Sequence, residues 1–522
     1  MTAVAASPAV PAGPIERLLA QVEIRPDAPA IEMEASGQVL SYRGLQGLIE
    51  DVRAALQALG VGEGDAVLVA LPACPELVAA FYALASLSAL FVPVAEDLTP
   101  FELAPVLADA RPKGVIVAEA GMLARVLGPS VGFALLLQGQ APVVQAIDGV
   151  RVAVLAQWVG QQQGRRCALQ PPPGNPLVSC HFTYKGLGYP LGVLHRYASY
   201  GACIEGLLAS AGVRAGSVHL ALLPLHPIYA LLASVLSPLS LGAHVIVVTG
   251  SGRRHVLALL GRRQVECASL VPTIYRLLVA QARSPGRHKA GALHPELLLV
   301  TGGSHMSPEA MAEVEEAVGV RPSQGYGLTE ALLVCANFRG SAQPHSLGLP
   351  LQGGLRGGVQ VAVLDAQGQP LPAGRVGEIV VSGPCLMQGY LGRPRETARF
   401  LKGGRMHTGD LGHLDAQGYL HFDGRAMPFT KSAAQMVDLP EIEAVLRRHP
   451  LVADARASVR NDPLRGERVD ASVVLRAGAA IQGEDLVTFA RGYLSPHKVP
   501  RSVRLFQRGL VATGAQDFQE SA

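Results

Sequence analysis

The chain of 522 residues has only seven cysteines, and none of them forms part of a recognisable pair. They are odd in number and scattered, with no C-x-x-C motif and no histidine cluster at metal-ligand spacing. This absence excludes a disulfide framework and a structural zinc site of the usual kind. The pattern predicts reduced, mostly buried thiols in a cytoplasmic protein.

The sequence also lacks an excess of charge of one sign. Its 44 basic and 41 acidic residues leave a net charge of +3, without long runs of either sign. A protein that binds nucleic acid usually carries a basic patch or stripe, so we expect no such partner. Hydrophobic residues make up 49% and charged residues 16%, a composition that predicts a packed protein rather than a disordered one.

Long, strongly apolar runs are missing as well. Residues 1–20 are small and Pro-rich but lack a basic start followed by an unbroken apolar core, so they make a poor signal peptide. The most apolar stretch, residues 76–94, contains Ala and Ser and reaches a proline after one helix length. It predicts a buried helix that runs into a strand, and no membrane span.

Short β-rich runs that alternate with helical patterns dominate the first half of the chain. The runs are "DAVLVALP", "KGVIVAE", "HVIVVTG" and "LLLVTGG", and the helical patterns cover residues 41–60 and 307–319. This alternation predicts stacked βα units, a largely parallel sheet and an α/β fold. Residues 158–176, rich in Gln, Gly and Pro, are expected to form a surface connection.

The pattern changes twice toward the C-terminus. From residue 359 onward, short strands with "AQGQ" and "AQGY" turns predict a small β subdomain. After residue 424, two helical and three strand patterns are enough for a small domain of their own. We therefore predict two domains, residues 1–423 and 424–522.

Several separated motifs point to one family. "SQGYGLTEA" (Ser323–Ala331), "MHTGDLG" (Met406–Gly412) and "FDGR" (ending at Arg425) follow the Gly-rich loop "FTYKGLGYPLGVLH" (Phe182–His195) and precede "LSPHKVPRSV" (Leu494–Val503). In this order and spacing they resemble the adenylate-forming superfamily of acyl-CoA synthetases, peptide-synthetase adenylation domains and luciferases. The resemblance covers nearly the whole chain, and "LSPHKVPR" is most similar to the CoA-ligase branch.

The resemblance implies a fold and a reaction. The fold is a large N-terminal domain of stacked, mostly parallel sheets with a β subdomain, followed by a small mobile C-terminal α+β domain. The reaction joins a small carboxylic acid to the α-phosphate of ATP with Mg²⁺, and then passes the acyl group to a thiol of CoA or of a carrier protein's phosphopantetheine. A monomer or homodimer with a specialised, secondary-metabolic role is expected.

For the nucleotide, the resemblance assigns residues motif by motif. Tyr326, between Gly325 and Gly327, is expected to lie against adenine, and the turn Gly302, Gly303 and Ser304 borders it. Thr329 is expected to contact phosphate and Glu330 to hold Mg²⁺. The purely structural alternative for this motif is a strand end that caps a helix through Thr329.

Two charged residues complete the predicted nucleotide site. Asp410 is expected to accept both ribose hydroxyls through its two oxygens, and Arg425 to reach the ribose or phosphate. The alternatives are a structural aspartate in a turn and a surface arginine.

For the acid, His226 in "PLHPIY" corresponds to the family's gate between the nucleotide and acyl sites. Its alternative is a packed core histidine. Tyr229 and Gly303 are expected to shape an acyl site for an apolar or aromatic acid.

The phosphate loop departs from the family pattern T-S-G-T-T-G-x-P-K-G. The residues aligned with it run from Thr183 through Tyr184 and Lys185 to Gly186, Gly188, Leu191 and Gly192. The backbone can still cradle an anion through its glycines, but Leu191 replaces the family's lysine. We hypothesise that Lys185 supplies the displaced charge; a solvated loop lysine is the alternative.

Three further departures lie in the C-terminal part. Ala515 stands where the family has the lysine that bridges the carboxylate and the α-phosphate, and without that charge adenylation is expected to be weaker by several kcal/mol. Met427 stands at the hinge, where the family usually has Asp or Lys, and Ala434 stands where the family usually has Gly. The first hypothesis is therefore an acid–thiol ligase with an altered phosphate site. The second is an adenylation-deficient homologue, limited to the second half-reaction or to binding nucleotide or carrier protein.

Overall fold

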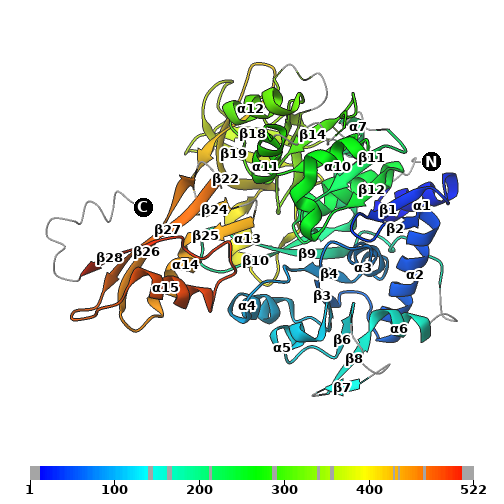
Figure 1. The fold of residues 1–522 in the computed structure, drawn as a ribbon, viewed down its shortest axis with the longest axis horizontal. Coiled ribbons are helices and arrows are strands. Elements are labelled where there is room, and N and C mark those ends of the chain that lie inside the picture. The colour runs from blue at the N-terminus through cyan, green and yellow to red at the C-terminus, as the bar shows by residue number, and fades with distance from the viewer. Residues whose placement is uncertain are drawn as a thin grey trace, which may run out of the picture.

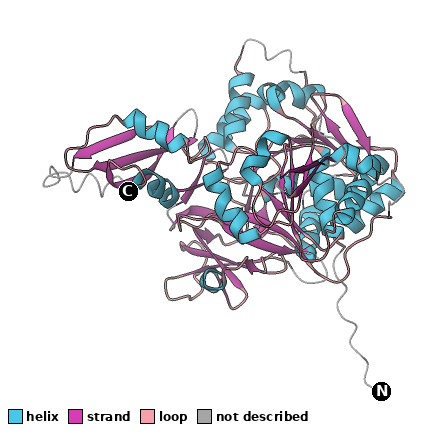
Figure 2. Cartoon of the chain, turned by 90° about the horizontal axis from the view of Figure 1, so that it is seen from below, coloured by secondary structure: helices cyan, strands magenta, loops and turns pink. Residues whose placement is uncertain are grey.

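The computed structural model describes residues 12–138, 145–147, 149–161, 167–210, 214–284, 291–337, 341, 343–352, 358–426, 429–432, 435–462 and 466–507. Figure 1 shows a large body that contains most of the chain and a smaller C-terminal part, orange to red, beside it. Figure 2 gives the same division from below. The predicted α/β class is confirmed.

The first large sheet has nine strands in the order β17-β16-β15-β14-β13-β11-β12-β1-β2. Pairing is parallel from β15 through to β1, and antiparallel at β2, β16 and β17. The strands are β1 (Pro29–Met33), β2 (Gln38–Ser41), β11 (Val218–Ala221), β12 (His244–Val247), β13 (Cys267–Leu270), β14 (Leu298–Thr301), β15 (Ser323–Leu328), β16 (Leu332–Ala336) and β17 (Leu349–Pro350).

The second large sheet also has nine strands, in the order β20-β10-β9-β4-β3-β5-β6-β8-β7. It is parallel from β9 through to β8 and antiparallel at β7, β10 and β20. The strands are β3 (Ala66–Ala70), β4 (Leu90–Pro93), β5 (Gly114–Val117), β6 (Phe133–Leu136), β7 (Gln145–Ile147), β8 (Val150–Val154), β9 (Leu177–Thr183), β10 (Leu191–Arg196) and β20 (Gly389–Tyr390).

Both sheets are covered on both faces, which explains why their strands read as continuous apolar runs. In β3, Val67 and Val69 belong to the central core between the sheets, whereas Leu68 and Ala70 face an outer layer. The central layer contains α2 (Tyr42–Ala58), α3 (Pro75–Ser86) and α7 (Tyr197–Ser210). The outer layers are α10 (Val256–Arg262), α11 (Pro272–Ala282) and α12 (Pro308–Val318) on the first sheet, and α4 (Pro100–Ala110) and α5 (Leu123–Val126) on the second.

The remaining α-helices of the body are α1 (Pro14–Ile24), α6 (Leu155–Gln161), α8 (Ile228–Leu231), α9 (Ser237–Leu241) and α13 (Pro394–Phe400). A π-helical segment, Leu232–Leu236, joins α8 to α9.

Helix α3 is the helix expected within residues 76–94. Every one of its residues except Glu76 in the first turn is buried, and the chain continues into β4. A helix that is apolar on all sides belongs in the interior. No helix among the described residues is long and apolar enough to cross a membrane.

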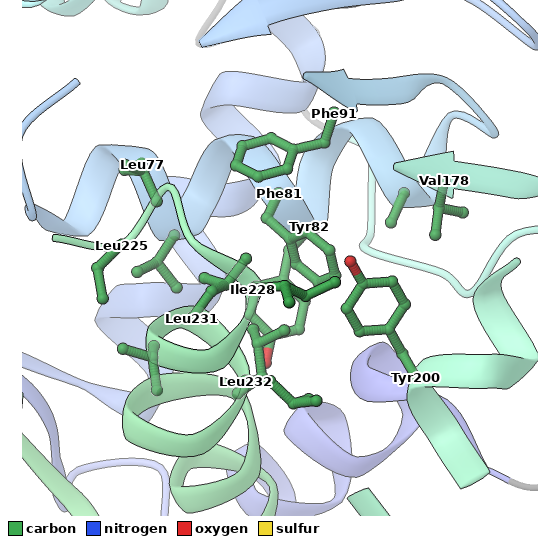
Figure 3. Packing of buried hydrophobic residues seen from close by; sticks show 14 of the residues in the cluster. Leu77, Phe81, Tyr82, Phe91, Val178, Tyr200, Leu225, Ile228, Leu231 and Leu232 are labelled. Atoms are coloured by element: carbon green, nitrogen blue, oxygen red, sulfur yellow. The ribbon is translucent and has the colours of Figure 1, made fainter. Parts of the chain in front are cut away.

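Aromatic rings fill the centre of this core (Figure 3). Phe81 of α3 makes ring contacts with Tyr82, Phe91 and Tyr200, with centroid separations of 5.2–5.5 Å. The hydroxyl of Tyr200 is hydrogen-bonded to the ring of His181 at 3.1 Å, and the other ring nitrogen of His181 lies 3.3 Å from the carbonyl oxygen of His226. The core therefore fixes the backbone of His226, one of the predicted site residues.

One connection was predicted wrongly. The segment 158–176 was expected to contain no regular element, but its first four residues complete α6 (Leu155–Gln161). Trp158 anchors this helix, because its indole N–H donates to the carbonyl of Ala55 at 3.1 Å. Residues 167–176 have no helix or strand, as expected.

The predicted β subdomain is present as an antiparallel sheet of β18 (Gln360–Leu364), β19 (Gly377–Ser382), β21 (Leu401–Lys402), β22 (Arg405–Leu414) and β23 (Leu420–Arg425). Its two "DAQG" hairpins are built alike. Asp365 and Asp415 each accept two backbone N–H groups of their turn at 2.8–3.0 Å, and Gly368 and Gly418 supply the positive φ.

The C-terminal part has its own core, formed by buried residues from Val437 to Leu494. It contains β24 (Phe429–Ser432), β25 (Gln435–Asp438), α14 (Leu439–Arg447), α15 (Gly483–Arg491) and a sheet of β26 (Val452–Asp462), β27 (Gly466–Leu475) and β28 (Val503–Gln507). The helices and strands expected after residue 424 are thus confirmed. The exact boundary at 423/424 stays a prediction.

Candidate active site

Most of the predicted nucleotide residues meet around one small cavity of about 60 Å³. Adjacent parallel strands β14 and β15 end at the same edge of the sheet, and the loop after β9 and the strands β22 and β23 close the space. The predicted residues that line it are Thr183, Lys185, Gly303, Ser304, Gly325, Tyr326, Gly327, Thr329, Glu330, Asp410 and Arg425.

At one end of this cavity, Asp410 is held by two neighbours. The hydroxyl of Tyr326 donates to its Oδ2 at 2.7 Å, and Nε of Arg425 donates to its Oδ1 at 2.8 Å. Burial and the nearby carboxylate raise the pKa of Tyr326 well above its usual value, so its hydroxyl keeps the proton that it donates. The three predicted residues form one hydrogen-bonded group.

For these two charged residues the structure contradicts the turn and the surface position that the alternatives assumed. Asp410 lies inside β22, directly opposite Arg425 in β23, and not in a turn. The side chain of Arg425 is only 22% exposed and forms an ion pair.

The turn after β14 contributes close backbone packing and a free hydroxyl. A side chain at Gly302 would meet the ring of Tyr229 at 2.6 Å, and Gly303 has a φ of +77°. The Oγ of Ser304 is buried and has no hydrogen-bond partner among the described residues. A buried hydroxyl of this kind is available to a ligand.

Thr329 lies in the turn between β15 and β16, so the alternative that it caps a helix is wrong. His195 of β10 fixes this turn, because its Nε2 donates to the carbonyl of Thr329 at 2.6 Å. Burial lowers the pKa of His195 to about 4, which keeps the ring neutral at pH 7. Nothing in the sequence singled out His195 except its place at the end of the loop motif.

The phosphate loop is a β-hairpin between β9 and β10. Gly186 and Gly188, with φ of +69° and +82°, form its turn. Leu191 is fully buried in β10, and Gly192 also lies in this strand, where a side chain would meet Sγ of Cys180 at 2.8 Å. Gly192 was predicted to bind the cofactor, but in the structure it faces the core and does not line the small cavity.

The N–H groups of this turn already have an anionic partner. Gly188 donates to Oδ1 of Asp438, the residue before α14, at 3.0 Å, and the same oxygen caps the helix through the N–H of Glu441 at 3.1 Å. Burial raises the pKa of Asp438 to about 6, although hydrogen bonds from Glu441, Gly188 and Gly186 oppose the rise. A carboxyl group of the C-terminal part thus lies where the loop could hold a phosphate.

Tyr184 binds the loop to a buried ionic cluster. Its hydroxyl donates to Glu441 at 2.8 Å and accepts from Lys498 at 3.0 Å. Lys498 forms ion pairs of 2.8 Å with both Glu441 and Glu102. Burial alone would lower the pKa of Lys498, but Tyr184 and the two carboxylates raise it well above its usual value. This cluster joins α4, the loop and the C-terminal part.

Lys185 is not a solvated loop lysine, and that alternative is wrong. Its side chain is 4% exposed and forms an ion pair with Glu330, Nζ to Oε1, at 3.1 Å. The same Oε1 accepts the hydroxyl of Tyr390 at 2.7 Å. Burial and Glu330 raise the pKa of Tyr390 well above its usual value, so the phenol remains a donor.

A second cavity of about 430 Å³ adjoins the first and shares with it the segment from Gly325 through Gly327 to Thr329. The predicted acyl-site residues His226, Tyr229, Gly302 and Gly303 line it. Apolar side chains form much of its wall: Leu222, Leu223, Val271, Ile274, Leu332 and Leu333. Burial lowers the pKa of His226 to about 4, so its ring is neutral at pH 7. The histidine is a wall residue and not only a core residue.

Three predicted departures, Met427, Ala434 and Ala515, lie outside the described residues.

Comparison with known families and proteins adds an independent result. The family of AMP-binding enzymes matches residues 18–391, and the family described as the AMP-binding enzyme C-terminal domain matches residues 441–515.

Individual proteins agree over nearly the full length. The chain is 27% identical to a long-chain-fatty-acid–CoA ligase from Bacillus subtilis (strain 168) over 507 residues, covering 91% of this chain and 88% of the relative. It is 28% identical to a feruloyl-CoA synthase from Amycolatopsis sp. over 508 residues, covering 95% of each. Among solved structures, the amide bond synthetase McbA from Marinactinospora thermotolerans shares the fold, with a TM-score of 0.80, 24% identity and coverage of 95% and 96%.

Proposed function

The chain belongs to the family of AMP-binding enzymes, within the adenylate-forming superfamily, and from this premise we propose that it is an ATP-dependent acyl-activating ligase. It activates a carboxylic acid as the acyl-adenylate and transfers the acyl group to a thiol of CoA or of a carrier-bound phosphopantetheine. Its relatives named as CoA ligases or synthases support the general reaction.

One observation carries the proposal: the two cavities share the segment from Gly325 to Thr329. One cavity contains the Tyr326–Asp410–Arg425 group and the other has largely apolar walls. A nucleotide in the first and an acid in the second would bring the acid's carboxylate and the α-phosphate together at Thr329. Holding two reactants in the correct geometry supplies a large part of the rate acceleration in phosphoryl-transfer reactions.

The roles then follow from chemistry. Tyr326 lies beside adenine. Asp410 accepts hydrogen bonds from ribose, and Arg425 forms an ion pair with the same carboxylate. Ser304 and Thr329 offer hydroxyls to the nucleotide. A carboxylate oxygen attacks the α-phosphorus, the bond to pyrophosphate breaks and pyrophosphate leaves. In the second step the thiolate attacks the acyl carbon and AMP leaves.

The larger cavity favours an acid with an apolar body. Its volume of about 430 Å³ lies within the range of roughly 300–1,000 Å³ that small-molecule pockets occupy. The neutral ring of His226 stands in its wall beside Pro227 and Ile228, where it can contact the acyl group without adding charge.

A second candidate is favoured by a specific observation. The loop amide of Gly188 binds Asp438, and the two polar departures from the family pattern, Tyr184 and Lys185, bind Glu441 and Glu330. A chain with these contacts would retain nucleotide binding and lose adenylation. It would carry out only acyl transfer from a preformed adenylate, or bind nucleotide or carrier protein without catalysis.

The experiment that separates these functions has three parts. ATP–pyrophosphate exchange and hydroxylamine trapping with a panel of aliphatic and aromatic acids test adenylation. Synthetic acyl-adenylates with CoA or holo carrier protein test acyl transfer. Calorimetric titration with ATP, AMP and holo carrier protein tests binding. Exchange supports the ligase; acyl transfer or binding without exchange supports the second candidate, and no binding at all would contradict both.

We further propose that the protein acts in the cytoplasm on a specialised pathway, and that the two functional domains divide near residue 424. These proposals rest on the composition and on the family resemblance.

A further inference from the structure

The ion pair between Lys185 and Glu330 lies in the wall of the smaller cavity. Lys185 stands where the family's loop has a glycine, and Glu330 follows the threonine of the "GLTE" motif. Their charged atoms are 3.1 Å apart, and the side chains are 4% and 1% exposed. Both residues line the cavity that contains Tyr326 and Asp410.

Three segments of the chain hold this pair in place. Tyr390 of β20 donates to Oε1 of Glu330 at 2.7 Å, and Nζ of Lys185 donates to the carbonyl of Thr408 in β22 at 3.3 Å. The N–H of Met387 donates to the backbone carbonyl of Glu330 at 2.8 Å. Hydrogen bonds of this kind define the geometry of a buried ion pair, whereas an exposed pair is held loosely.

The family resemblance implies that a magnesium ion is bound at this glutamate. Magnesium commonly takes one or two protein carboxylates, with water and phosphate oxygens completing an octahedron. Here Oε1 of Glu330 already accepts from one ammonium and one phenol. A divalent cation at this oxygen would meet the ammonium of Lys185 at short range in a buried setting, where repulsion is weakly screened. The residues present therefore do not fit a metal held by Glu330.

Across the described part of the chain, no group of three or more His, Cys, Asp or Glu side chains is placed to hold a metal ion. The ammonium of Lys185 is the cation that the fold itself supplies to Glu330.

We infer that Lys185 replaces a metal ion as the counter-charge of Glu330, so that the nucleotide binds in this cavity without a metal bound to the protein. The inference rests on the proposed nucleotide site. Lysine brings one positive charge, whereas Mg²⁺ brings two. The pair therefore offers less positive charge to a developing pentavalent phosphate. We expect nucleotide affinity to be retained while the rate of ATP cleavage is reduced.

The first test measures ATP binding by calorimetry in EDTA and in excess Mg²⁺. The wild-type protein should show dissociation constants within about threefold of each other in the two conditions. The variant K185M, which keeps the length of the side chain and removes its charge, should bind ATP about tenfold more weakly in EDTA and regain affinity in Mg²⁺. A matched control is K113M, which removes a lysine from the half-exposed pair with Asp65.

Either of two results would overturn the inference: a wild-type protein that loses affinity tenfold or more in EDTA, or a K185M variant that matches the wild type in both conditions. Failure of every form to bind ATP would instead contradict the proposed function.

A second test needs no nucleotide. Melting temperatures of the wild type, K185M and the double variant K185M/E330Q are compared with and without 10 mM Mg²⁺. Magnesium should raise the melting temperature of K185M by a few degrees, because the freed carboxylate gains a cation, and should leave the other two unchanged. Equal responses of K185M and the double variant, or stabilisation of the wild type, would refute the exchange of lysine for metal.

Discussion

The two ends of the smaller cavity are built in opposite ways. At the proposed adenosine end, Tyr326, Asp410 and Arg425 are the residues that the family resemblance predicts, and they contact one another. At the phosphate end, Tyr184 and Lys185 depart from the pattern, and each is bound to a buried carboxylate elsewhere. The difference teaches that Tyr184 and Lys185 do more than remove a family contact: each side chain has a polar partner elsewhere in the fold.

Among the described residues, the phosphate end contacts side chains of β25, of α14 and of the segment after α15, whereas Tyr326 and Asp410 at the other end contact Arg425 of β23. Asp438, Glu441 and Lys498 all lie beyond residue 424 and bind the loop or Tyr184. The cavity of about 60 Å³ is well below the roughly 300 Å³ of small-molecule pockets. Tyr184 lines this cavity and donates to Glu441, so it is the wall residue through which a wider cavity would loosen the contact with the C-terminal part.

The largest expected effect comes from the ionic cluster at the phosphate end. K498M should destabilise the protein by about 3–5 kcal/mol, because it leaves Glu102 and Glu441 buried without their shared cation. Differential scanning calorimetry measures the loss. The triple variant K498M/E102Q/E441Q is the control and should recover much of the stability; a single variant as stable as the wild type would contradict the role of the cluster.

The next effect depends on pH. The pKa of Asp438 is raised from the usual 3.8 to about 6, so the folded protein holds this proton more tightly than the unfolded chain. The stabilisation is complete below pH 4 and is lost as the pH rises through 6, which corresponds to at most about 3 kcal/mol.

D438N removes this ionisation and keeps an oxygen that can accept from Gly188. It should be more stable than the wild type at pH 8, with the difference vanishing below pH 4. Melting temperatures of both proteins across pH 4–8 provide the measurement. A variant that is less stable than the wild type at pH 8 would show that the charged carboxylate stabilises the contact.

Removal of a single hydroxyl should have a smaller effect. Y184F loses one hydrogen bond to Glu441 and one from Lys498, at a cost of about 2 kcal/mol. Because the contact with the C-terminal part is weakened, nucleotide affinity should rise. Y42F is a matched control, since Tyr42 donates to the carbonyl of Ala243 far from the loop; it should cost stability without changing affinity.

The smallest effect is expected at the adenosine end, and it concerns binding. D410N keeps the shape of the side chain but weakens acceptance from ribose, so AMP should bind about tenfold more weakly, or about 1.4 kcal/mol. Isothermal titration calorimetry gives the constants. D415N, in the hairpin that follows, is the control and should bind AMP normally. Equal affinities of D410N and the wild type would remove Asp410 from the proposed site.

Much of the fold was predictable because its signals are local. Continuous apolar runs such as residues 65–72 predicted buried strands, and the "DAQG" turns predicted hairpins. The error at α6 has a clear cause: polar and flexible residues suggested a connection, whereas Trp158 stabilises the helix through a contact with α2 that no local pattern contains.

The adenosine end was predictable for a related reason. Its residues keep the identities and order of a family pattern, and the structure places them side by side. The roles of His195, Tyr390 and Asp438 were missed because each acts through a partner far away in the chain, 134 residues in the case of His195 and Thr329.

The sequence alone determined the α/β class, the family and most of the polar residues around the smaller cavity, because apolar periodicity and motif spacing are properties of short segments. Only the tertiary structure decided what Lys185, Tyr184 and Asp438 bind. A buried charge is stable only beside an opposite charge or a hydrogen-bond donor, and these partners come from strands and helices that lie far apart in the chain.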